Sequence, residues 1–112
     1  MNIYHITSRT AWAAAQTAGA YTVDSLASQG FIHCSKTDQI QRVANAFYQG
    51  QSALVILVIE TDRLAAEVRW EPGTDKPDEL FPHIYGVINL AAVTRSVDFP
   101  PNPDGTFPLP PL

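Results

Sequence analysis

The stretch Gly30-Phe31-Ile32-His33-Cys34-Ser35 has the pattern of a short strand that begins at a glycine. Because side chains alternate along a strand, Phe31, His33 and Ser35 are expected on one face. Ile32 and Cys34 are then expected on the other face, which is apolar and suits a hydrophobic core. The first face presents an imidazole and a hydroxyl, so it is the face on which we expect function.

The patterns on either side of this stretch predict an α+β fold with two main helices. Residues 54–59 are apolar throughout and rich in β-branched side chains, which indicates a buried central strand. An apolar stripe that ends at Phe47 has helical spacing, and Thr37 is expected to cap that helix. Trp12 and Phe47 are expected in the core. We predict further strands at 3–6, 67–71, 81–86 and 93–99, helices at 9–17 and 38–49, and helical turns at 24–26 and 89–92.

The bulk composition narrows the class of protein. The chain has 112 residues, of which 46% are hydrophobic and 16% charged, as in one ordinary globular domain. Its formal net charge is −4 and it has no basic run, so we expect no binding to duplex nucleic acid. The longest apolar run, 53–59, is too short to span a bilayer. With a single cysteine, Cys34, and no signal-peptide pattern, the sequence predicts a cytoplasmic protein.

The composition changes near residue 100. Six of the thirteen residues from 100 to 112 are proline, which lacks the amide hydrogen that a strand ladder needs. We therefore predict a single domain over residues 1–99 and an extended or disordered proline-rich tail over residues 100–112.

Three histidines, His5, His33 and His83, each lie in a short strand-like segment with apolar neighbours on the opposite face. A buried neutral histidine is unfavourable unless it is hydrogen-bonded. Three interpretations stay open: a zinc site with an open position, structural residues bonded to the backbone, and a pocket that holds a polar molecule. The pocket is favoured and no metal is expected, because no two histidines have close spacing and none adjoins a carboxylate.

Other reactive side chains have alternatives of their own. Cys34 lies on the face opposite His33, so we expect a small buried side chain rather than a nucleophile. Arg69 and Glu71 share a strand face and form either a solvated ion pair or a charged edge of the pocket. Tyr85 shares a face with His83 and would stack on a ligand ring or fill the core. The sequence has no glycine-rich phosphate-binding motif.

Four segments carry a family resemblance: residues 3–7, 30–35, 69–71 and 81–86. In their order and spacing they resemble the small bacterial domain-of-unknown-function family 952, from Met1 to about Val97. The proline-rich tail lies outside this resemblance.

A more distant resemblance suggests a ligand. Tyr4-His5-Ile6-Thr7 is similar to the first-strand motif of the ADP-ribosyltransferase superfamily. Residues 30–35 resemble the second motif of its RNA 2'-phosphotransferase branch, with His33 and Ser35 at the matching positions. This resemblance implies a small split β-sheet with two main helices, around a cleft that binds NAD or an ADP-ribosylated intermediate.

The sequence departs from that superfamily at several positions. Ile6 stands where the first motif has glycine, and His83 stands where the third motif usually has glutamate. Only Glu71, from another segment, can supply the carboxylate. Arg69 is the one arginine able to stand in for those of the phosphotransferases.

These observations together predict an ADP-ribosyltransferase-like enzyme that acts on NAD or on an ADP-ribose or phosphorylated-ribose substrate. Glu71 would stabilise a cationic ribosyl transition state, and His83 would orient the substrate or transfer a proton. Two alternatives remain, a non-catalytic nucleotide-binding module and a metal-dependent enzyme that uses the three histidines. The predicted substrate-binding residues are His5, Thr7, His33, Ser35, Arg69 and Tyr85.

Overall fold

In the computed structural model, which describes residues 1–112, eight strands and three helices form a mixed α+β domain, as the sequence predicts. The strands belong to three small antiparallel sheets, ordered β1-β4-β8, β3-β6-β5 and β2-β7. The elements are β1 (Asn2–Ser8), α1 (Arg9–Ala18), β2 (Ala20–Tyr21), α2 (Asp24–Gln29), β3 (Ile32–His33), α3 (Ile40–Phe47), β4 (Leu54–Glu60), η1 (Thr61–Arg63), β5 (Glu67–Pro72), β6 (Leu80–Tyr85), β7 (Ile88–Asn89), η2 (Leu90–Ala92) and β8 (Val93–Asp98).

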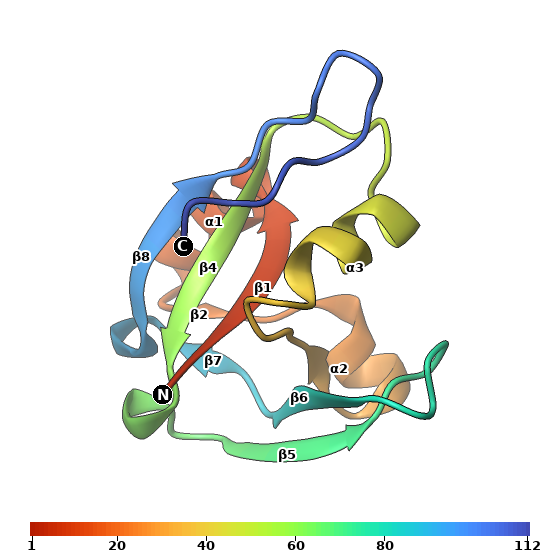
Figure 1. The fold of residues 1–112 in the computed structure, drawn as a ribbon. Helices are drawn as coiled ribbons and strands as arrows, with labels where there is room; N and C mark the ends of the chain where they lie inside the picture. The colour runs from red at the N-terminus through yellow and green to blue at the C-terminus, as the bar shows by residue number, and fades with distance from the viewer.

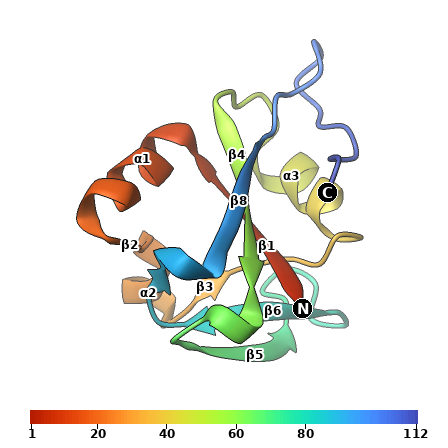
Figure 2. The ribbon, with the colours of Figure 1, turned by 90° about the vertical axis from the view of Figure 1, so that its left-hand side faces the viewer.

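The β4 strand is the centre of the molecule, because both of its faces are buried. Val55, Leu57 and Ile59 belong to one hydrophobic core, while the alternate side chains of β4 belong to a second. Figure 2 shows the arrangement that this requires, with α1 on one side of the β1-β4-β8 sheet and α3 on the other. The prediction of a buried central strand at 54–59 is confirmed.

The β3-β6-β5 sheet crosses below the first sheet, with β5 at its outer edge (Figure 1). His33 lies directly opposite His83, and His83 lies directly opposite Arg69. An isolated bridge between Tyr4 and Ser35 joins the two sheets, with backbone N–H···O distances of 2.9 and 2.7 Å. The segment that follows β3 is thereby brought next to β1.

The first helix follows its predicted signals. The Ser8 hydroxyl accepts a hydrogen bond from the Ala11 amide at 3.0 Å, and Gly19 ends the helix. The predicted turn at 24–26 is longer than expected and forms the helix α2. Gly30 ends α2 with a φ of 90°, a left-handed conformation that favours glycine.

The third helix differs from the prediction at both ends. It begins at Ile40 rather than Asp38, and Thr37 does not cap it. The turn before α3 is instead held by Gln39, whose side chain accepts from the Lys36 amide and donates to the Leu80 carbonyl. Phe47 is 56% exposed, so its prediction as a core residue is wrong. As the last residue of α3, it extends beyond the edge of the second core.

The tail after residue 100 forms no strand or helix, but it packs on the domain. Phe107 is buried in the second core with its ring centroid 4.8 Å from that of Phe99. Its amide donates to Asn45 Oδ1 of α3 at 2.7 Å. The tail therefore covers one side of α3, the helix that borders the candidate site. No helix of the chain combines the length and the apolar character that a membrane crossing requires.

Candidate functional site

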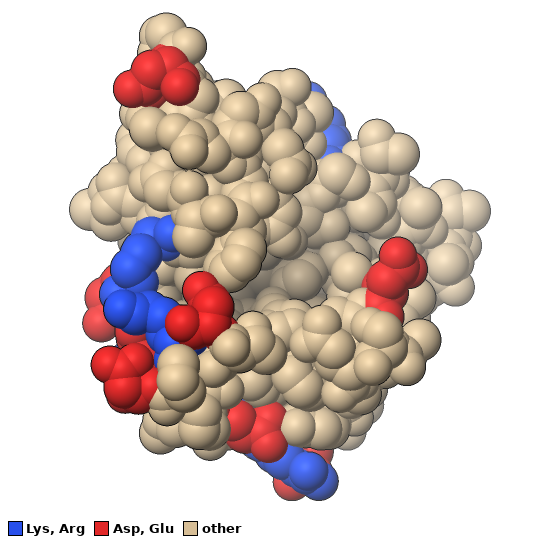
Figure 3. Space-filling model, turned by 90° about the vertical axis from the view of Figure 1, so that its right-hand side faces the viewer, with Lys and Arg blue, Asp and Glu red and all other residues tan.

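A cavity of about 190 Å³ lies between β1, β3, α2 and α3, at the junction of the two larger sheets. Figure 3 shows this face of the molecule hollowed, with charged side chains around the hollow rather than in it. No Lys, Arg, Asp or Glu lines the cavity. Its walls come from Tyr4, His5, Ile6, Val23, Ser25, His33, Cys34, Ser35, Val43, Tyr48 and Phe81.

His5 is held from both ring nitrogens. Its Nδ1 lies 2.6 Å from the His33 carbonyl, which can only accept, so Nδ1 carries the proton. Burial lowers the pKa of His5 to about 4, so the ring is neutral at pH 7 and Nε2 accepts from the Tyr21 hydroxyl at 2.8 Å. The Tyr21 oxygen is also 2.8 Å from Thr7 Oγ1. Because the Tyr21 proton is directed to His5, the Thr7 hydroxyl donates to Tyr21.

This buried chain has a structural consequence for the cavity. His5 on β1 fixes the carbonyl of His33 on β3, so it sets how the His33 backbone stands against β1. Burial raises the pKa of Tyr21 to about 12, so its hydroxyl stays protonated as a donor. Thr7 is buried behind Tyr21 and does not line the cavity.

His33 is half-buried at the wall of the cavity. Its Nε2 is 2.8 Å from the amide oxygen of Gln29, the last residue of α2. That oxygen accepts, so Nε2 carries the proton and the Nδ1 of the neutral ring keeps its lone pair. Burial, with the nearby His83, lowers the pKa of His33. The neutral form is therefore the dominant form at pH 7.

A second polar cluster lies on the same sheet, beside His33. Glu71 Oε1 accepts from His83 Nδ1 at 2.8 Å and from the Tyr85 hydroxyl at 2.6 Å. These hydrogen bonds, first from Tyr85 and then from His83, lower the pKa of Glu71, so its carboxylate is ionised at neutral pH. The same bond raises the pKa of Tyr85. Glu71, His83 and Tyr85 do not line the cavity.

Aromatic contacts connect the two groups of residues. The Phe31 ring stacks on His83 with centroids 4.0 Å apart and planes at 15°. The His33 ring meets His83 edge to face at 5.4 Å. His33 thus contacts the Glu71 cluster while it lines the cavity. Phe31 and His33 both contact His83, as their predicted common face requires, and Ile32 and Cys34 lie in a core. The regular strand is shorter than predicted, Ile32–His33, and Cys34 lines the cavity together with Ser35.

Arg69 stands at the solvent side of the second cluster. Its guanidinium lies 4.2 Å from the Tyr85 ring centroid and donates to Glu67 at 3.0 Å. Arg69 pairs with Glu67 and Glu71 binds His83, so the predicted solvated ion pair between Arg69 and Glu71 does not form. The other alternative, a charged edge of a ligand site, stays a prediction. Cys34 is buried, and burial raises the pKa of its thiol, as expected of a structural side chain.

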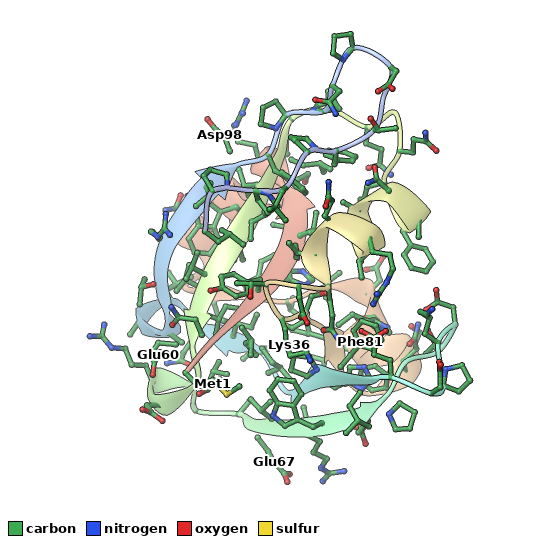
Figure 4. The ribbon with its side chains drawn as sticks, viewed as in Figure 1. Met1, Lys36, Glu60, Glu67, Phe81 and Asp98 are labelled. Carbon is green, nitrogen blue, oxygen red and sulfur yellow. The ribbon has the colours of Figure 1, made fainter.

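A groove of about 330 Å³ adjoins the cavity and shares two of its walls, Val43 and Phe81. It runs between α3 and the loop that joins β5 to β6. Figure 4 shows Phe81 between β6 and α3. Arg42 of the groove is neutralised by Glu79, which accepts from it at 2.6 and 2.7 Å, whereas Lys76 forms no salt bridge.

The three histidines do not converge as metal ligands. No three His, Cys, Asp or Glu side chains are grouped so that they could hold a metal ion. Both ring nitrogens of His5 are already engaged within the protein. The predicted site residues thus fall into three places: a cavity wall with His5, His33 and Ser35, a cluster with Glu71, His83 and Tyr85, and the outlying Thr7 and Arg69.

The profile of the family described as "Protein of unknown function (DUF952)" matches residues 6–96. The chain belongs to this family. The predicted resemblance to family 952 is therefore confirmed. These matches do not show the more distant resemblance to ADP-ribosyltransferases, which stays a prediction.

Solved structures support the fold of this DUF952 domain. The crystal structure of protein CC0527 from Caulobacter crescentus is 34% identical, with a TM-score of 0.86, over 97% of this chain and 95% of that chain. The solution NMR structure of CC0527 is also 34% identical, with a TM-score of 0.80, over 94% and 90% of the two chains. No curated protein matches this chain.

Several residues of the site were not singled out from the sequence. Tyr21 lies outside every predicted helix and strand, and its partners are 14 and 16 residues away, so no local pattern marks it. Gln29 was equally unmarked, although it bonds His33 only four residues later. Tyr4 belongs to the first-strand motif but was not predicted to line a cavity, and Tyr48 follows α3 without a recognisable signal.

Proposed function

We propose that this DUF952 domain binds a nucleotide-type ligand of the NAD or ADP-ribose class in the cavity and the adjoining groove. The main support for the proposal is that the two segments that resemble ADP-ribosyltransferase motifs, residues 4–7 and 30–35, form one wall of the cavity. Tyr4 and His5 come from the first motif, and His33 and Ser35 come from the second, and all four line one cavity. A mostly apolar cleft with a few polar groups is the usual form of a small-molecule site.

The residues have different roles in this proposal. His33 and Ser35 contact the ligand. His5 acts as a positioning residue, because it holds the His33 backbone and has no free ring nitrogen. Thr7 supports His5 through Tyr21. Tyr85 and Arg69 bind a part of the ligand that extends from the cavity over the sheet.

A transferase activity is the second candidate, and Glu71 supports it. An ionised carboxylate fixed by two hydrogen bonds is a preorganised charge, which can stabilise the cationic ribosyl group of an ADP-ribosyl transfer. Glu71 also binds His83 Nδ1, so in the neutral ring Nε2 is free to accept a proton from an attacking hydroxyl. On this proposal Glu71 and His83 are the catalytic residues.

Calorimetry and thermal-shift measurements with NAD, ADP-ribose and a 2'-phosphorylated RNA test the binding proposal. We expect sub-millimolar binding of at least one of them, weakened by His33→Ala. The absence of both heat and thermal shift with all three ligands would contradict the proposal.

Turnover of a ligand that binds separates an enzyme from a binding module. We expect Glu71→Gln to bind within about threefold of the native protein and to lose transfer by roughly a hundredfold or more, since it removes the charge and keeps the shape. Asp62→Asn, which removes an exposed carboxylate outside the site, is the control and should leave transfer intact. Binding by the native protein without any product would leave the non-catalytic module as the function.

A further inference from the structure

We propose that the cavity receives an uncharged heterocyclic base of the ligand, and that the anionic phosphates extend into the groove beside Lys76. This inference rests on the proposed function and adds the orientation of the ligand. It assigns Tyr4, Ser35 and Tyr48 as the residues that recognise the base, and Lys76 as the residue that recognises the phosphates.

The charge of the walls decides which part of the ligand enters. No carboxylate, lysine or arginine lines the cavity, and His33 is neutral at pH 7. A phosphate placed there would lose its hydration without gaining a counter-charge, which is strongly unfavourable. A pyridinium ring would likewise find no carboxylate partner. An uncharged ring meets neither penalty.

Unpartnered hydroxyls supply the hydrogen bonds that such a ring needs. Tyr4 is 7% exposed and Ser35 is 4% exposed, both line the cavity, and neither hydroxyl has a hydrogen-bond partner within the protein. The hydroxyl of Tyr48, on the facing wall, is also unpartnered. No side-chain nitrogen or oxygen atom of the chain is both buried and unpartnered, so these hydroxyls are open to the cavity, where the polar edge of a ligand can take the place of water.

Shape and placement agree with a ring. Tyr4 and Ser35 are opposed across their backbone bridge, so their side chains leave the backbone on the same side. The apolar walls, among them Ile6, Val43 and Phe81, suit the faces of a planar ring. An apolar cavity of about 150 Å³ is known to bind benzene, so a cavity of about 190 Å³ has room for a ring with polar substituents.

The groove shows in which direction the rest of the ligand would leave the cavity. It begins at Val43 and Phe81, where the cavity ends, and Lys76 lines it without a salt-bridge partner. Arg42 is already paired with Glu79, and the groove wall also carries the carboxylate of Asp75. Lys76, which forms no salt bridge with either carboxylate, is the cation left for a phosphate. A base in the cavity therefore directs the attached phosphates toward Lys76.

Calorimetry with adenosine, AMP and ADP-ribose tests both parts. We expect Ser35→Ala and Tyr48→Phe each to weaken the binding of all three ligands by about three- to tenfold, as for the loss of one hydrogen bond. Lys76→Gln should weaken AMP and ADP-ribose to a similar extent and leave adenosine unchanged. Ser96→Ala, which removes an exposed hydroxyl on β8, is the control.

Competition with nicotinamide mononucleotide, whose base is a pyridinium, provides an independent result. We expect it not to displace adenosine. Displacement of adenosine by this ligand, native affinity in both hydroxyl variants, or an equal effect of Lys76→Gln on adenosine and AMP would each overturn the orientation while the proposed function stands. If neither NAD, ADP-ribose nor any of these ligands binds, the proposed function fails and the inference fails with it.

Discussion

The Tyr21 hydroxyl holds two residues that support the wall of the cavity. It joins His5 to Thr7 through two hydrogen bonds of 2.8 Å in a buried place. His5 in turn fixes the His33 carbonyl. The geometry of the cavity wall therefore depends on a residue that does not line the cavity.

Replacing Tyr21 with phenylalanine should destabilise the fold by about 1 to 3 kcal/mol, because the polar atoms of His5 and Thr7 lose their partner where water cannot replace it. Tyr48→Phe is the matched control, since its hydroxyl has no partner within the protein, and it should change stability by less than about 0.5 kcal/mol. Denaturant unfolding of both variants measures the difference. Equal stability of the two variants would show that the hydrogen bonds that Tyr21 makes with His5 and Thr7 contribute nothing to the free energy of unfolding.

At the residue scale, the sequence predicts the direction of a side chain better than its hydrogen-bond partners. The alternation of Phe31, His33 and Ser35 is readable because it depends on neighbours two residues apart. The state of His5 is not readable, since both of its partners lie far along the chain. The sequence could name His5 as important without showing that its ring nitrogens are already used.

Among the elements, the tail has a larger role than its composition suggests. The ring of Phe107 closes the second core against Phe99, and Asn45 of α3 binds the Phe107 backbone. Proline prevents regular hydrogen-bonded pairing, but it does not prevent one aromatic side chain from being buried. The tail therefore supports the helix that forms a wall of the groove.

Phe107→Ala should lower the free energy of unfolding by about 3 to 5 kcal/mol, as expected when a large core side chain is removed. Leu109→Ala, two residues further in the same tail, should have an effect below about 0.5 kcal/mol because Leu109 is 70% exposed. Urea unfolding compares the two variants. A small effect of Phe107→Ala would mean that the tail is not part of the folded unit.

The bounds of α3 differ from the prediction at both ends, and its start shows why. The predicted start at Asp38 relied on local capping by Thr37. The observed start at Ile40 depends on Gln39, whose side chain reaches Glu79 and Leu80 some forty residues later. A tertiary contact thus replaced the local signal.

At the scale of the whole molecule, stability should depend on pH through His5 and His33. Burial lowers the pKa of His5 from 6.5 to about 4, so the unfolded chain binds a proton in that interval and the folded chain does not. Stability is therefore fully present above pH 6.5 and is lost as the pH falls toward 4. The lowered pKa of His33 acts in the same direction.

Between pH 7 and pH 5 we expect His5 to account for a loss of about 2 kcal/mol in the free energy of unfolding. His5→Gln removes the titrating ring, so the variant should lose much less over the same interval, whatever its stability at pH 7. Carboxylates such as Glu71, with their lowered pKa, contribute only at lower pH. Denaturant unfolding of both proteins at the two pH values measures the slopes, and equal slopes would contradict the burial of a neutral His5.

The sequence by itself determined the features that rest on local periodicity. These are the α+β class, the buried strand at 54–59, the two-faced stretch at 30–35 and the membership of family DUF952. Each can be read within a few residues or from motifs in order, because side-chain direction follows backbone conformation.

Only the tertiary structure decided which of these residues meet. It separated the cavity of His33 and Ser35 from the cluster around Glu71, and it buried Phe107 in the core. The physical reason is that hydrogen bonds and packing join residues that are distant in sequence, such as Asn45 and Phe107, 62 positions apart. No local pattern encodes such a pair.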